Sequence, residues 1–265
     1  MQPLISEFSY GYVLTQELAT GILGGITGAP IFPSLRDEGQ PGGGYDVELP
    51  RVGFPLYLQF KLSDYLSRTS ANEWDVFMAP YYRMHLRPLR HSDQHNLLLD
   101  LERAGNEVYY AAPEFHTQPE LNDAYFKREV FLRSRLFRPL AIGPLPDDDA
   151  HYVAFRARAQ AYRFSAEGLQ IESSSGEELR SRIKHLASLE QKNLDGKFLE
   201  SACSSLLSII EGHTSCKESA HTLEKELKRE KRSRDAQAAY LSYLSWVFFG
   251  TQLILIGPSS SPQRA

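Results

Sequence analysis

The segment FPLYLQFKLS, residues 54–63, constrains the fold most, because its side chains alternate in the way that those of a β-strand do. One face of this strand carries Phe60 together with other apolar side chains. The opposite face carries Gln59 and Lys61, which are neighbours two positions apart. The alternation therefore predicts a strand that holds an amide and an ammonium group side by side on a largely apolar element.

A second strand is expected just before it, at residues 44–50 (GYDVELP), with residues 51–53 as the connecting turn. If the two strands close as a hairpin, Asp46 comes opposite Gln59. A carboxylate, an amide oxygen and an ammonium group then lie together. Hard divalent cations such as Mg²⁺ prefer oxygen ligands, and Lys61 would orient a water molecule or stabilise developing charge. The hairpin thus predicts a site for metal-dependent phosphodiester hydrolysis.

The remaining patterns predict helices and further strands around this hairpin. Helices are expected at 6–23, with Ser6 as the N-cap, at 93–104, with Gly105 as the stop, and at 119–135. Strands are expected at 76–86, at 107–115, buried on both faces, and at 151–155, at a sheet edge. Residues 24–44 are rich in Gly and Pro and are expected to form a surface loop. This order of elements indicates an α/β domain with a mixed central sheet flanked by helices, over residues 1–160.

The stretch Gly44-Tyr45-Asp46, followed after twelve residues by Gln59-Phe60-Lys61, resembles the active-site motif of the PD-(D/E)XK nuclease superfamily. The resemblance is strongest to the Mrr-like restriction endonucleases, in which Gln replaces the usual acid. It covers residues 6–115 and reaches residue 155 with the last strand. It implies a restriction-endonuclease-like fold, in which a first helix precedes a bent hairpin and a further strand and helix complete the core.

The same resemblance implies a function. It implies an endonuclease that uses Mg²⁺ or Mn²⁺ to cleave DNA, with a role in defence against foreign DNA such as that of phages. Glu17, on the first expected helix, is similar to the acidic residue that such enzymes often supply as a metal partner. The implied catalytic residues are Asp46, Gln59, Lys61 and Glu17, and the implied metal ligands are Asp46, Gln59 and Glu17.

The formal net charge of −4 excludes a strongly basic chain, so DNA binding requires a local groove. Arg83, Arg87 and Arg90 lie in a basic and aromatic stretch and are the expected phosphate contacts. His91 and His95 are four residues apart and could share a helix face. No third ligand with suitable spacing accompanies them, so a zinc site is not expected there.

Residues 161–265 are expected to be a mainly helical region that positions substrate, forms a homodimer or docks a partner protein. Residues 217–239 are highly charged and contain no Pro or Gly, which favours a long exposed helix. Residues 240–257 are eighteen positions without a charge after a basic run. Two alternatives stay open for them: a helix buried against the protein or a second copy, and a membrane segment.

The two cysteines, Cys203 and Cys216, form no pattern typical of a zinc site, and the first residues lack the features of a secretory signal. A reducing cytoplasm is the expected compartment.

Two alternatives to a nuclease also stay open. Asp46 and Lys61 are equally well explained as solvated charges on a half-exposed hairpin, and the domain would then be a catalytically silent interaction module. The second alternative is a membrane-associated protein anchored through residues 240–257.

Overall fold

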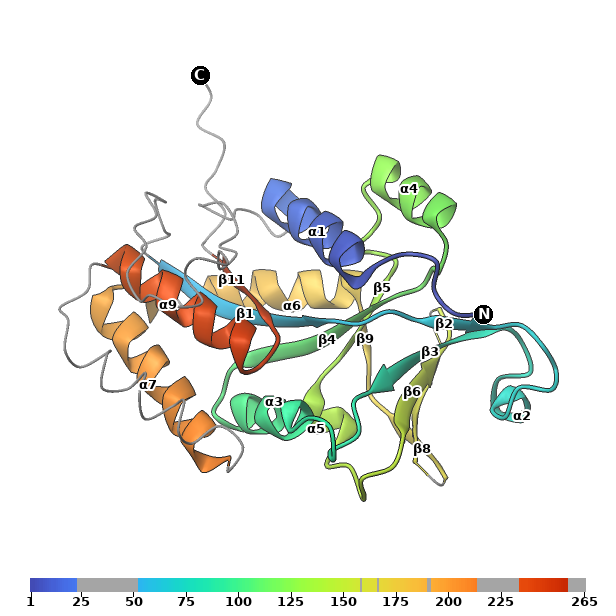
Figure 1. The fold of residues 1–265 in the computed structure, drawn as a ribbon. Helices are drawn as coiled ribbons and strands as arrows, with labels where there is room; N and C mark the ends of the chain where they lie inside the picture. The colour runs from blue at the N-terminus through green and yellow to red at the C-terminus, as the bar shows by residue number, and fades with distance from the viewer. Residues whose placement is uncertain (23–51, 158, 166, 190–191, 214–233, 257–265) are drawn as a thin grey trace. The chain divides into compact units, whose positions relative to one another are not determined.

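The computed structural model describes most of the chain, and its helices and strands form a mixed α/β fold (Figure 1). The described residues are 1–22, 52–157, 159–165, 167–189, 192–213 and 234–256. The strand predicted at 44–50, which would contain Asp46, therefore lies outside the described residues, as do Cys216 and most of the charged segment 217–239.

The helices with regular α geometry range from four to seventeen residues. They are α1 (Glu7–Glu17), α2 (Trp74–Phe77), α3 (Gln94–Arg103), α4 (Gln118–Lys127), α5 (Pro139–Ile142), α6 (Gly176–Leu189), α7 (Gly196–Gly212) and α9 (Arg234–Val247). A π-helical turn, η1 (Leu18–Ile22), continues α1.

The strands are short, apart from the first. They are β1 (Val52–Phe60), β2 (Asp64–Leu66), β3 (Tyr81–Leu86), β4 (Glu107–Pro113), β5 (Ser134–Phe137), β6 (His151–Phe155), β7 (Ala161–Phe164), β8 (Gly168–Ile171), β9 (Ser174–Ser175), β10 (Lys192–Asn193) and β11 (Gln252–Ile256).

The chain divides into two compact units, each built from segments that are distant in sequence. Unit 1 comprises Met1–Leu18, Gln59–His95 and Tyr109–Arg182, and unit 2 comprises Ala19–Leu58, Asn96–Val108 and Ile183–Ala265. These units are clusters in space rather than continuous stretches of sequence. The expected boundary at residue 160 therefore stays a prediction.

Unit 1 contains a five-stranded antiparallel sheet in the order β2-β3-β6-β7-β8. One of its faces is a packed core that includes Met84, Val153 and Phe155, all essentially buried. The prediction that 151–155 is an edge strand is wrong, because β6 pairs with β3 on one side and with β7 on the other. The sequence did not predict β7, because a strand of four residues is too short to show a clear alternation of side chains.

The single strand predicted at 76–86 is wrong in its first half. Helix α2 occupies its beginning and ends at Phe77, and the left-handed backbone of the C-cap residue Met78 (φ 51°) turns the chain before β3 starts. The predicted helix at 93–104 is confirmed as α3, and Gly105 follows it with φ 87°, a conformation that favours glycine.

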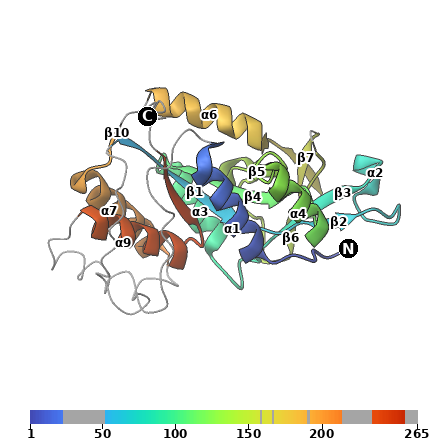
Figure 2. The ribbon, with the colours of Figure 1, turned by 90° about the horizontal axis from the view of Figure 1, so that it is seen from above.

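Helices α1 and α4 lie side by side in unit 1 and run in the same direction (Figures 1 and 2). At their N-terminal ends the backbone N–H of Leu4 donates to the carbonyl of His116, 2.7 Å away. At their C-terminal ends Glu17 accepts a hydrogen bond from the backbone N–H of Phe131. Ser6 caps α1 as the sequence predicts, because its hydroxyl accepts from the N–H of Ser9 at 2.9 Å.

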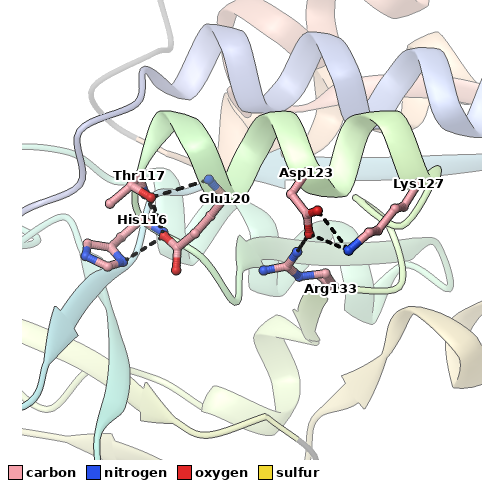
Figure 3. A network of polar contacts seen from close by, with 6 residues as sticks. All are labelled: His116, Thr117, Glu120, Asp123, Lys127 and Arg133. Atoms are coloured by element: carbon pink, nitrogen blue, oxygen red, sulfur yellow. Dashed lines mark hydrogen bonds and ion pairs between the residues drawn. The ribbon is translucent and has the colours of Figure 1, made fainter.

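Helix α4 begins with a capping box, in which Thr117 and Glu120 each accept from the other's backbone N–H (Figure 3). It ends at Lys127 because Arg128 adopts a left-handed conformation with φ 56°. The predicted helix over 119–135 is therefore too long, because residues 129–133 belong to the turn before β5 and residues 134–135 belong to β5 itself.

Strand β1 confirms the strand predicted at 54–63 over most of its length. The larger sheet has the order β10-β1-β4-β5-β9, and β11 also pairs with β1. Among the described residues the antiparallel partners of β1 are β10 and β11. Strand β4 is buried over six of its seven residues, which confirms the prediction of a strand covered on both faces.

In unit 2, α7 packs against α9, and α9 packs against β11 (Figure 2). Cys203 of α7 is buried, and its thiol contacts the carbonyl of Gln237 on α9 at 3.7 Å. The alternative of a single buried helix over 240–257 is wrong, because α9 ends at Val247 and β11 follows after a turn at Gly250 (φ 63°). Among the described residues, none of the helices combines the length and the apolar character that a bilayer crossing requires.

Candidate functional site

The two faces of β1 separate at its end, as its alternating sequence predicts. Phe60 packs toward α1, where its ring meets the ring of Tyr10 edge to face at 5.9 Å between centroids. Gln59 turns to α3 instead, and its Oε1 accepts a hydrogen bond from Gln94 Nε2 at 3.0 Å. Both Gln59 and Phe60 are buried, at 4% and 7% exposure. These side-chain partners confirm the prediction that Gln59 and Phe60 lie on opposite faces of the strand.

Lys61 follows directly and is also buried, with 8% of its surface exposed. Its backbone N–H donates to the carbonyl of Ala111 on β4 at 2.9 Å, which fixes the chain at this point. Burial lowers the pKa of the Lys61 ammonium, the negative charge of Glu7 partly restores it, and the positive charge of Arg87 lowers it further. Lys61 is therefore a cation that the fold holds away from water at the end of a central strand.

Glu7 is the acidic side chain of α1 that acts on Lys61. It lies in the first turn of the helix and keeps contact with solvent. Partial burial raises the pKa of its carboxyl group, while the charges of Lys61 and Arg87 counteract that rise. The sequence did not single out Glu7. The available signal was Gly11, one helical turn further on, because a glycine inside a helix often marks a close approach.

Glu17 is held at the other end of the same helix. One of its oxygens accepts from the backbone N–H of Phe131 at 3.1 Å. Burial raises the pKa of its carboxyl group, and hydrogen bonds from the N–H groups of Phe131 and Val130 oppose that rise. Ten residues of α-helix separate Glu17 from Glu7, or about 15 Å at 1.5 Å per residue. The structure thus ties Glu17 to the turn before β5 and brings Glu7 into the vicinity of Lys61.

The three arginines predicted to bind phosphate have different surroundings. Arg83 forms an ion pair with Glu73 at 3.4 Å and lies within β3. Arg90 is exposed and approaches Asp149 at 3.8 Å, an arrangement that contributes little stability at a surface. Of the three, Arg87 is the one whose charge acts on both Lys61 and Glu7.

His95 is buried near the same place and has defined partners. Its Nε2 donates to the carbonyl of Gly143 at 2.8 Å, so its Nδ1 accepts from the hydroxyl of Tyr110 at 2.9 Å. Burial lowers the pKa of the His95 imidazole, which favours the neutral ring. Because both ring nitrogens are engaged, His95 supports the fold here. Within the described ranges, no group of three His, Cys, Asp or Glu side chains is arranged to hold a metal ion.

At the end of β1 the charges of Glu7 and Arg87 act on Lys61, whereas Gln59 faces Gln94 on α3 and Asp46 lies outside the described residues. This arrangement offers the oxygen atoms of the Glu7 carboxylate together with two cations. Such a set can bind a phosphate group through its cations and a hard divalent cation through its oxygens. Comparison with protein-family models, with curated proteins and with solved structures gives no match for this chain.

Proposed function

We propose that this protein is a metal-dependent endonuclease of restriction-endonuclease-like fold that hydrolyses phosphodiester bonds of DNA, with foreign DNA such as that of phages as its target. One observation carries the proposal: Lys61 is buried at the end of β1 with a lowered pKa, beside Gln59 and under the charge of Glu7. A buried lysine costs free energy, so a fold that keeps one at a strand end has a reason other than stability.

Each residue has a role in this proposal. Gln59 and Asp46 supply oxygen ligands, and Glu7 supplies the helix carboxylate that the sequence pattern assigned to Glu17. Lys61 stabilises the negative charge that develops on the phosphate. A Mg²⁺ or Mn²⁺ ion bound by these oxygens would polarise the phosphate and lower the pKa of a coordinated water. The residues fit such an ion, because Gln59 Oε1 retains a second lone pair beside the hydrogen bond from Gln94.

The test is cleavage of plasmid and single-stranded DNA by the purified protein with Mg²⁺, with Mn²⁺ or with EDTA. We expect metal-dependent cleavage that falls by roughly 10²–10³-fold in Lys61→Met, the loss typical of removing one charge-stabilising group. Asp46→Ala should abolish it. The matched control is Lys184→Met, which removes an exposed lysine on α6. Cleavage that persists in both Lys61→Met and Asp46→Ala would refute the proposed site.

A second candidate is a catalytically silent module, which the bond from Gln94 to Gln59 favours because it already occupies one of the two lone pairs of the amide oxygen. This candidate predicts that Gln94→Ala leaves DNA binding unchanged and gives no cleavage. The nuclease proposal instead predicts cleavage by the wild-type protein.

A further inference from the structure

A row of aromatic rings crosses one face of the five-stranded sheet in unit 1. His85 on β3 lies directly opposite Tyr152 on β6, and Tyr152 lies directly opposite Phe164 on β7. The ring centroids of His85 and Tyr152 are 6.0 Å apart, and those of Tyr152 and Phe164 are 5.6 Å apart with nearly parallel planes (21°). We call these three residues the ring row. They share one face because each pair is in register.

The ring row lies on the face of the sheet opposite to the core of Met84 and Val153. The imidazole of His85 is 57% exposed, and Tyr152 and Phe164 are half-buried. Gly168 on β8 stands directly opposite Phe164, and a Cβ at Gly168 would lie 2.7 Å from Cε1 of that ring. Because Gly168 has no side chain, the Phe164 ring can lie over β8.

The carboxylates beside the ring row are engaged by neighbouring donors. The buried Glu73 accepts hydrogen bonds from the hydroxyl groups of Tyr81 and Tyr152, and it forms an ion pair with Arg83. Asp64 lies 2.9 Å from Nε2 of His85. The guanidinium of Arg83 lies 4.8 Å from the centre of the Tyr152 ring. The face therefore presents the exposed imidazole of His85 beside two half-buried rings, and Arg83 and both carboxylates are already paired.

Strand β3 connects this face to the end of β1. Arg87 is two residues beyond His85, which is about 7 Å along an extended chain. The charge of Arg87 acts on Lys61. A polymer with flat apolar rings and a phosphate backbone would match this sequence of groups, because bases stack on aromatic side chains while phosphates approach cations.

We infer that the ring row binds single-stranded nucleic acid, with bases stacked on His85, Tyr152 and Phe164 and with the backbone directed along β3 to Arg87. The inference rests on the proposed function in one respect, because it names a single strand as the substrate class that reaches Lys61. Stacking is tolerant of base identity, so DNA and RNA share the required chemistry.

The test is fluorescence anisotropy of a labelled oligo-dT, an oligo-rU of the same length and an abasic oligonucleotide, all in EDTA so that nothing is cleaved. We expect oligo-dT to bind more tightly than the abasic strand, and Phe164→Leu to weaken oligo-dT binding by roughly tenfold while abasic binding stays constant. Phe126→Leu is the matched control, since it removes an 81% exposed ring on α4, outside the ring row. The oligo-rU arm shows whether the ring row also accepts RNA, and weakened oligo-rU binding in Phe164→Leu counts for the inference.

His85→Ala provides a second variant whose side chain is exposed, should Phe164→Leu fail to fold. Equal binding of the abasic strand and oligo-dT, or unchanged oligo-dT binding in both ring variants, would overturn the inference. Lys61→Met separates the two proposals. If the ring variants weaken binding but the wild type does not cleave DNA, the nuclease proposal alone has failed. If cleavage depends on Lys61 but the ring variants bind as the wild type does, the inference about the ring row alone has failed.

Discussion

The ring of Phe60 occupies the space in which a side chain at Gly11 would begin, because a Cβ on Gly11 would lie 2.6 Å from Cδ2 of that ring. This contact sets how closely α1 approaches the end of β1. Glu7 is one helical turn before Gly11 and so shares its face of α1. Lys61 follows Phe60 in the chain. The missing side chain at Gly11 therefore determines how near the Glu7 carboxylate comes to Lys61.

Gly11→Ala should lower the free energy of unfolding by about 1–3 kcal/mol, although alanine is the better helix former, because the added methyl group must displace a buried ring. Cleavage should fall as well, since α1 moves away. Urea denaturation and the plasmid assay measure the two effects. Gly212→Ala is the matched control, with no atom within 4 Å of its Cβ. If Gly11→Ala with Phe60→Leu does not recover part of the stability, the ring contact is not the cause.

Lys61→Met should reduce cleavage by roughly 10²–10³-fold and yet raise the free energy of unfolding by about 1 kcal/mol at neutral pH, because it removes a buried cation. Burial lowers the pKa of Lys61 from its usual 10.5, so the unfolded chain binds more protons between the lowered pKa and 10.5. Wild-type stability should therefore rise relative to Lys61→Met across that pH range. Thermal denaturation of both proteins at increasing pH gives the comparison, and a constant difference would show that Lys61 is not desolvated.

The two acids of α1 should behave in opposite ways. Glu17→Ala leaves the N–H of Phe131 without its acceptor and should cost about 1–3 kcal/mol of stability, with cleavage by the folded fraction unchanged. Glu7→Ala should leave stability nearly unchanged and reduce cleavage, since its carboxylate acts on Lys61. Chemical denaturation and single-turnover cleavage separate these effects. Loss of cleavage in Glu17→Ala alone would return the metal-binding role to Glu17.

Low pH should destabilise the first turn of α4, because it protonates the carboxyl group of Glu120. Burial alone would raise the pKa of this carboxyl group, but hydrogen bonds from the N–H of His116 and from Thr117, with the charge of His116, lower it below 4.5 (Figure 3). Its contribution to stability is therefore complete above pH 4.5 and is lost as the pH falls through the lowered pKa. Glu120→Gln should melt at a lower temperature than the wild type at neutral pH. The difference should shrink on acidification, and a difference independent of pH would contradict this.

Local patterns predicted several elements of the fold. The helix cap at Ser6, the alternation around Phe60 and the glycine stop at Gly105 each depend on a few consecutive residues. The turn at Arg128 and the inner position of β6 could not be predicted, because neither a left-handed arginine nor a strand's neighbours leave a local pattern. The strand at the end of the chain was missed for a similar reason, since a short apolar run fits a buried helix or a buried strand equally well.

The candidate site was predictable only in part. Gln59 and Lys61 could be placed because a strand shows its faces in its sequence. Which acid of α1 acts on Lys61 depends on the rotation of the helix against β1, and that rotation is set by the contact of Gly11 with Phe60. No pattern within α1 alone reveals it. Asp46 stays a prediction, because it lies outside the described residues.

The pairing of β1 with β11 determines when this chain can complete its fold during synthesis. Phe54 pairs with Ile256, about 200 residues later, so an edge of β1 stays open until β11 has left the ribosome. That edge belongs to an apolar strand, and open apolar edges pair readily with other chains. A nascent chain that stops before Gln252 should therefore be prone to aggregation and should depend on chaperones, whatever the activity of the finished protein.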